Sequence, residues 1–262
     1  SCFANILGLN ISAALDSAVT VYILIPFLLI PQILLSGVIV RFEKLHPSIT
    51  QMEGVPLIGN IMTSRWAYEA LAVEQFANNP FEKKFFLMDA VMSRATYKKD
   101  WWIAAMQERL DKCEHLLIQK APADSFSVPL KVLINGFYEE AALNSSNRFL
   151  FLDEFQKNLF THQAGQQARM ALDTLKEFYI NQFNAASEKK ENLITRLTDT
   201  PQREGIFNYE KNKYENESLE EMVRSSNQTD RLVVTNEKII QRFEPVYHVN
   251  ASEKLFKAPL FS

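Results

Sequence analysis

The sequence predicts a mainly α-helical protein, with one proline-kinked transmembrane helix followed by a largely helical, water-soluble region. Residues 1–40 contain a single charged side chain, Asp16, whereas the other 222 residues carry all 28 basic and 30 of the 31 acidic side chains. In this charged region, apolar residues recur at steps of three and four, which is the spacing of one helix face. The mean hydropathy of -0.14 therefore averages a lipid-like piece with a water-like piece.

The composition excludes several classes of protein. Seven glycines and ten prolines are too few for a collagen-like or low-complexity chain. Two cysteines, Cys2 and Cys113, cannot build a disulfide framework. A net charge of -3 and a pI near 5.9 give no basic field, so nucleic acid is not expected as a partner.

The predicted membrane span is Ser17–Val40, a run of 24 residues without a charge. A helix of that length is about 36 Å long, enough to cross a hydrocarbon core of roughly 30 Å. The alternatives are a buried core helix, which rarely lacks charge for so long, and a cleaved signal peptide, which would follow a basic segment. Pro26 and Pro31 should bend the span, and Gln32 is placed to satisfy carbonyls that the prolines free. The two prolines either shape packing only or take part in gating.

The segment before this span is also apolar. Residues 1–12 resemble the tail of an earlier membrane segment, and the chain starts at Ser1 rather than at a methionine. We therefore expect a fragment of a larger membrane protein. Residues 1–40 form its first predicted domain: the end of one helix, a turn and the transmembrane helix.

The second predicted domain, residues 41–78, consists of a loop and a short helix. Two prolines and two glycines punctuate the stretch from His46 to Asn60. Thr63 or Ser64 then caps a helix that runs to about Phe76.

The third predicted domain, residues 79–262, is helical. Asn79 is a helix cap, Pro80 suits the first helical position and Glu82 follows three residues after the cap. Helical spacing then continues to Leu117. The remaining predicted elements are a helix over Leu130–Leu143, a long helix from about Asp153 to Leu197 that Pro201 ends, a weak helix near Glu217–Arg224 and a short strand over Arg231–Thr235.

Motifs for catalysis are missing from the sequence. It contains no phosphate-binding loop and no zinc-protease, paired-cysteine or serine-hydrolase motif, so we expect no enzyme activity, cofactor or metal site in this chain. Cys113, Glu114 and His115 are adjacent and point to different sides of a helix, so they cannot share one ion. Cys113 fits the apolar stripe better.

Two other groups of residues have ordinary structural explanations. Of the adjacent Trp101 and Trp102, one is expected in the core and the other partly exposed, although tryptophans beside lysines also occur at membrane interfaces. The charged run 187–192 is interpreted as a solvated helix face.

A Ser-Gly-apolar-apolar step occupies Ser36–Val40, and the stretch Met62–Phe76 follows it after a loop. Through these motifs, residues 5–78 resemble the fifth membrane helix and following segment of the G-subfamily (white, eye-pigment type) ABC exporters. In the family this stretch is a short re-entrant helix with an Arg-aromatic-x-aromatic-x-Ala-Leu pattern. The matching residues here are Arg65, Trp66, Tyr68, Ala70, Leu71 and Phe76.

Within this family the resemblance is closer to a bacterial branch of permeases that are fused to an ATP-binding domain and carry a large extracytoplasmic loop before the last membrane helix. The resemblance implies an integral protein of the bacterial inner membrane, with the residues after 41 extracytoplasmic. It also implies that this chain lacks the ATPase domain, which would hold ATP and Mg, and the final helix. The implied partners are the lipid bilayer, the rest of the transporter, a second copy and an amphipathic substrate.

The resemblance assigns a gate to the end of the span. In these exporters the two apolar residues after the Ser-Gly step form a hydrophobic plug, a place taken here by Val38 and Ile39. Gly37 would let two backbones approach closely. The alternative is that both residues face lipid. For the whole chain, the alternative function is a single-span anchor that presents a helical binding or scaffold module.

Overall fold

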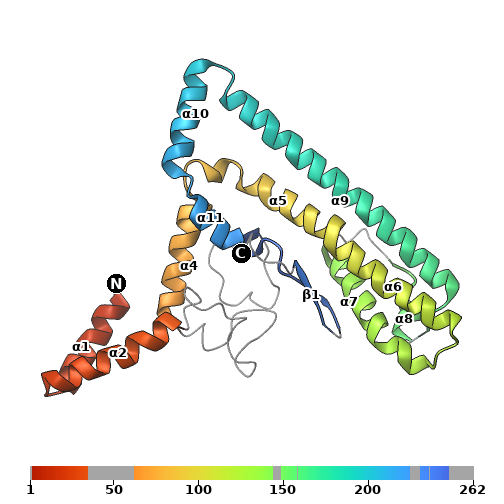
Figure 1. Ribbon diagram of the computed structural model, residues 1–262, viewed down its shortest axis with the longest axis horizontal. Coiled ribbons are helices and arrows are strands. Elements are labelled where there is room, and N and C mark those ends of the chain that lie inside the picture. The colour runs from red at the N-terminus through yellow and green to blue at the C-terminus, as the bar shows by residue number, and fades with distance from the viewer. Residues whose placement is uncertain are drawn as a thin grey trace. The chain divides into compact units, whose positions relative to one another are not determined.

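The computed structural model describes residues 2–34, 62–143, 149–157, 159–224, 231–235 and 237–247. These residues fall into two compact units that divide between Asn78 and Asn79 (Figure 1). The protein is mainly α-helical with little strand, which confirms the predicted class. Unit 1 holds the described residues up to Asn78, and unit 2 holds those from Asn79 onward.

Unit 1 contains the apolar helices. Helix α1 is Cys2–Ala14 and helix α2 is Ala18–Leu34, with Pro26 and Pro31 inside it. None of the residues of α1 or α2 is buried. Among the described helices, none has both the length and the apolar character needed to cross a membrane. The last part of the predicted span, residues 35–40, lies outside the described residues.

The third helix of unit 1 is α4, Thr63–Phe76, which ends at Phe76 as predicted. The predicted cap at Thr63 or Ser64 is wrong, because Met62 occupies the N-cap position and no side chain caps the helix. Unit 2 then begins with Asn79, whose side-chain oxygen accepts hydrogen bonds from the backbone N–H groups of Phe81 and Glu82, at 3.0 and 2.8 Å. Asn79 therefore accepts the predicted capping hydrogen bonds, but no α-helix begins at Pro80. The 3-10 turn η2 (Glu82–Lys84) has Phe81 at its N-cap position, and the next helix starts only at Phe86.

One long helical rod follows. It consists of α5 (Phe86–Thr96), the π-helical segment η3 (Tyr97–Trp102) and α6 (Ile103–Ile118). The rod ends at Lys120, which has φ of 53°. The N–H groups of Lys120 and Ala121 bond to the carbonyls of Leu117 and Leu116, an arrangement that satisfies the free carbonyls at a helix end.

The second half of the helical domain departs from the prediction. The single helix expected from about Asp153 to Leu197 is two helices, α8 (Leu152–Gln156) and α9 (His162–Leu197). Thr161 separates them because its hydroxyl accepts a hydrogen bond from Ala164 N at 3.1 Å and so caps α9. Before them lie η4 (Ala123–Phe126) and α7 (Ser127–Leu143), which starts three residues earlier than predicted.

After α9 the chain holds more structure than the sequence suggested. Helix α10 (Pro201–Tyr214) is not predicted from the sequence, where Pro201 indicates only the end of the previous helix. In the structure Pro201 instead occupies the first position of a new helix, which proline tolerates well. Helix α11 occupies Glu217–Arg224 as predicted. Strand β1 (Leu232–Val234) pairs antiparallel with a second strand, β2 (Ile239–Gln241), and the turn η5 (Pro245–Tyr247) follows.

The core of unit 2 lies where α6, α7 and α9 meet. Helix α9 runs beside α5 and α6 over much of their length (Figure 1). The packing of α6 on α7 is close: a Cβ at Gly136 would lie 2.7 Å from Met106 Sδ. The core is apolar and includes the fully buried residues Trp102, Met106, Leu110, Leu133, Phe137, Phe155 and Leu172.

Candidate functional site

The predicted gate is largely outside the described residues. Gly37, Val38 and Ile39 all belong to the stretch 35–61, of which the structure describes nothing. Gln32 lies in α2, where its backbone carbonyl accepts a hydrogen bond of 2.6 Å from Ser64 Oγ of α4. This contact joins the apolar helix to the helix that carries the family-like motif.

The motif residues on α4 occupy different faces of the helix. Arg65 is buried, forms a 2.9 Å ion pair with Glu69 and places its guanidinium 4.4 Å from the centre of the Trp66 ring. Phe76 is buried as well. Trp66 and Tyr68 are half-buried, whereas Ala70 and Leu71 are exposed.

A buried charge centre lies in unit 2, within the π-helical segment. Lys98 is 7% exposed and forms an ion pair with Glu140 of α7. Tyr179 of α9 donates a 2.6 Å hydrogen bond to the other carboxylate oxygen of Glu140. Lys98 Nζ also lies 4.0 Å from the centre of the Trp102 ring, a distance at which a cation is attracted to the π face.

Burial dominates the electrostatics of this centre. It lowers the pKa of Lys98, and Glu140 opposes that shift by favouring the charged ammonium. Burial raises the pKa of Tyr179, and the carboxylate of Glu140 raises it further. A centre that joins three helices and is this enclosed suits a structural role, fixing α7 and α9 against the rod. π-helical segments also occur often at functional sites.

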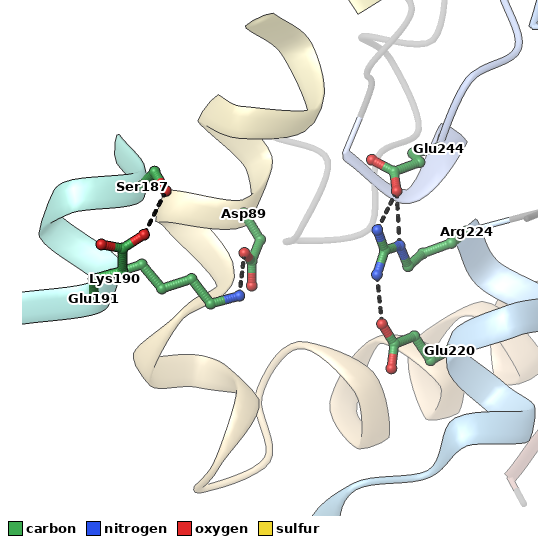
Figure 2. Close-up of polar contacts among 7 residues, drawn as sticks. All are labelled: Asp89, Ser187, Lys190, Glu191, Glu220, Arg224 and Glu244. Atoms are coloured by element: carbon green, nitrogen blue, oxygen red, sulfur yellow. Dashed lines mark hydrogen bonds and ion pairs between the residues drawn. The ribbon is translucent and has the colours of Figure 1, made fainter. Parts of the chain in front are cut away.

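A second charged cluster lies at one end of unit 2, where Arg224 of α11 joins two carboxylates (Figure 2). Its guanidinium bonds to Glu220 Oε1 at 2.6 Å and, through Nε, to Glu244 Oε1 at 2.8 Å. Glu244 is 8% exposed and has φ of 42°, in the left-handed region that non-glycine residues seldom adopt. The ion pair therefore holds a strained backbone position.

Figure 2 shows a neighbouring ion pair between α9 and α5. Lys190 Nζ lies 2.5 Å from Asp89 Oδ1, and one turn away Ser187 donates a 3.2 Å hydrogen bond to Glu191. The sequence predicts that the run 187–192 is a solvated helix face. Most of the run is exposed, but the side chain of Lys190 packs against α5 and forms an ion pair with Asp89.

Glu82, in the first turn of unit 2, belongs to the same region. Its pKa is raised to about 7, first by burial and then by the carboxylates of Glu220, Asp89 and Glu215, while Lys190 lowers it. We call this group the root cluster, because residues from the first and last described segments of unit 2 meet in it. Its members are Glu82, Asp89, Lys190, Glu220, Arg224 and Glu244.

A hollow of about 440 Å³ opens beside Arg224. The guanidinium of Arg231, on its wall, lies 5.5 Å from the centre of the Phe243 ring. Carboxylates outnumber the cations on the walls. The lining consists of Glu217, Glu220, Glu221 and Arg224 from α11 and of Arg231, Phe243 and Glu244.

Neither charged cluster was predicted from the sequence, although the neighbouring tryptophans were. Trp102 is 1% exposed and Trp101 40%, which confirms that one is core and the other partly exposed. Cys113 is buried in the apolar core, and burial raises the pKa of its thiol to about 12. Among the described residues, no group of three or more His, Cys, Asp or Glu side chains is placed to hold a metal ion.

Comparison with known proteins adds no assignment. The chain matches no protein-family model, no curated protein and no solved structure.

Proposed function

We propose that this chain is part of the transmembrane permease of an ATP-driven ABC exporter for lipid-like or amphipathic substrates. One observation carries the proposal: α1 and α2 contain no charged residue, since Asp16 lies between them, and none of their apolar side chains is buried. Phe27 is 72% exposed and Tyr22 is 75% exposed. Moving a side chain of this size out of water is worth about 1.5–3 kcal/mol, so a lipid or helix-lined environment is strongly favoured.

The division of the chain also supports this function. Unit 2 has its own apolar core and a charged surface, as expected for a water-exposed domain attached to membrane segments. In this proposal residues 79–262 form the extracytoplasmic domain, and Val38 and Ile39 form the plug of the pathway. The chain itself performs no catalysis: ATP and Mg would bind to a separate domain of the transporter.

The membrane segment is tested first, with the full chain expressed in bacteria. Wild-type protein should stay in the membrane pellet after an alkaline carbonate wash. Leu29→Arg, in α2, should release a large part of it, because a charge at the centre of a span costs about 2.5–3.5 kcal/mol. Ile118→Arg is the matched control, since Ile118 is 80% exposed at the end of α6 in unit 2. Equal release of both variants would contradict the membrane assignment.

Topology is tested with reporter fusions. Alkaline phosphatase fused after Tyr214 should be active, because this enzyme folds only outside the cytoplasm, and a green fluorescent protein at the same site should be dark. The opposite pattern would exclude an extracytoplasmic unit 2.

The exporter proposal is separated from the single-span anchor by the gate residues. In the intact transporter, Val38→Ala with Ile39→Ala should change substrate-stimulated ATPase activity and export several-fold, because a hydrophobic constriction gates by excluding water. Expression and dimerisation should stay near wild type. Val19→Ala with Val21→Ala, at the other end of α2, is the control. Unchanged transport in a well-folded gate variant would refute the plug.

A further inference from the structure

Helix α10 has one side packed within unit 2. The ring of Phe207 lies 5.2 Å from that of Phe81 and 6.4 Å from that of Phe85, between centres. Glu210, one turn further along α10, forms an ion pair with Lys84. Both contacts are made with the first residues of unit 2, so the helix is fixed to the beginning of this unit.

The opposite side of α10 is open. Ile206 is 59% exposed and Tyr209 is 63% exposed. Gln202 and Lys213 are exposed as well, and the four residues recur at steps of three and four, so they share one face of the helix. A Cβ added at Gly205 would meet no atom of the neighbouring elements within 4 Å. We call the face formed by Gln202, Ile206, Tyr209 and Lys213 the outer face of α10.

The outer face combines apolar side-chain bodies with polar tips, and none of its residues is acidic. Lys213 Nζ lies 5.4 Å from the centre of the Tyr209 ring and 5.1 Å from that of Tyr214, distances at which a cation is attracted to an aromatic ring. Tyrosine and lysine are typical of a membrane interface. There the ring and the methylene stem lie against acyl chains, while the hydroxyl and the ammonium reach the headgroups.

The chain tethers this face near the membrane segments. In the proposed function α4 is the re-entrant helix at the bilayer, and it ends at Phe76. Phe81, on which Phe207 packs, follows five residues later. Five residues of fully extended chain reach at most about 18 Å. A short tether of this kind raises the effective concentration of the bilayer surface to about the millimolar range, so even a weak lipid contact is populated.

We propose that the outer face of α10 binds the phospholipid surface of the bilayer. Ile206 and Tyr209 enter the boundary between headgroups and acyl chains, and Lys213 bonds to headgroup phosphates. The proposal rests on the membrane function proposed above and adds a contact with the bilayer in unit 2. A protein partner is disfavoured, because two large apolar side chains cover far less than the roughly 1,200 Å² that a stable protein interface buries.

The test places a fluorescent probe on the outer face, in the full chain reconstituted into vesicles of phosphatidylcholine and phosphatidylglycerol. Cys2→Ser removes the exposed thiol, and Gln202→Cys then carries the probe, since Cys113 is buried. Lipids with a nitroxide near the top of the acyl chain should quench this probe about two-fold or more, because an interfacial helix lies about 5–10 Å deep. A probe at Ile118→Cys, which is exposed at the opposite end of the rod, should not be quenched.

Substitutions show which side chains hold the face at the lipid. Ile206→Glu with Tyr209→Glu should abolish the quenching at residue 202, because carboxylates are repelled by anionic headgroups and do not enter the acyl layer. Met170→Glu with Phe178→Glu is the matched control, since it adds the same two charges at exposed apolar positions of α9. The control should be quenched as wild type is; an equal loss in both variants would overturn the proposal.

A third probe separates the lipid contact of α10 from the membrane function itself. Phe27→Cys, in α2, should be quenched by lipids with the nitroxide deep in the acyl chain. If this probe is quenched and the probe at Gln202→Cys is not, the lipid contact is wrong and the membrane function stands. If neither probe is quenched, both fail.

Two further outcomes are decisive. A probe at residue 202 that is shielded from aqueous iodide but not quenched by lipid would show that protein covers the face, and would also overturn the proposal. Should the double glutamate variant of α10 fail to fold, the probes at residues 202 and 118 decide alone, since equal quenching of the two refutes a contact specific to α10.

Discussion

Helices α2 and α9 both form without interruption, yet they place their apolar residues in opposite environments. In α9 the apolar residues form one stripe, and Leu172, Leu175 and Tyr179 are buried against the neighbouring helices of unit 2. In α2 apolar residues occur on all sides, and none is buried. Phe27 is exposed, whereas Leu172 is not accessible at all.

The two helices obtain their stability from different surroundings. An amphipathic helix such as α9 is stabilised by partners in its own chain. A helix that is apolar all round needs an apolar environment on all sides. In unit 2 the apolar faces of the helices pack against one another. The apolar residues of α1 and α2, in contrast, are not buried by any of the described residues.

The largest loss of stability is expected at the buried charge centre, where Lys98 of unit 2 depends on its ion pair with Glu140. Glu140→Leu leaves Lys98 buried without a carboxylate and Tyr179 without its acceptor. The free energy of unfolding should fall by about 3–5 kcal/mol. Urea unfolding followed by tryptophan fluorescence measures it, because Trp102 lies next to Lys98.

The matched control removes both charges. Lys98→Met combined with Glu140→Leu should recover most of the lost stability, because a buried ion pair can be replaced by apolar side chains at little net cost. If the double variant is as unstable as Glu140→Leu alone, the loss comes from packing and the charge pair is not its cause.

A substitution in each helix tests the comparison directly. Leu172→Ala should lower the stability of unit 2 by about 2–5 kcal/mol, because it leaves a cavity in a close-packed core. Leu29→Ala in α2 should change the stability of unit 1 by less than about 0.5 kcal/mol, since Leu29 is exposed. Thermal unfolding followed by circular dichroism measures both. An equally large loss for Leu29→Ala would mean that α2 is packed on a partner after all.

The smallest effect concerns the backbone at the end of α6. Lys120→Gly should raise the stability of unit 2 by about 0.5–1 kcal/mol, because glycine adopts the left-handed conformation of Lys120 without strain. The same change at exposed Lys112, inside α6, should lower it by about 1 kcal/mol. Denaturant midpoints of the two variants should therefore move in opposite directions. A shift of both in the same direction would show that the left-handed conformation of residue 120 does not destabilise unit 2.

Local sequence was sufficient for the helices whose signals are local. The mainly helical class, the end of α4 at Phe76, the bounds of α11, the capping hydrogen bonds of Asn79 and the core position of Trp102 all follow from spacing and capping residues. These features depend on neighbours within a few positions, whose chemistry is readable in order along the chain. The pattern failed at Thr161, where a cap begins a new helix inside a stretch that reads as one period. It also failed at Pro201, which the sequence indicates only as the end of a helix but which begins α10.

Only the tertiary structure determines which charged residues come together in the two clusters. Asp89 and Lys190 are 101 residues apart in the chain, and Lys98 of η3 forms its ion pair with Glu140 of α7. The pKa of Glu82 is raised first by burial and then by carboxylates on three other elements. Each of these residues looks like an ordinary surface charge in the sequence, because the period of a helix shows which face a residue occupies but not which helix lies opposite. Burial and the charge of the opposing face, which set the pKa of Glu82 and of Lys98, exist only once the helices have packed.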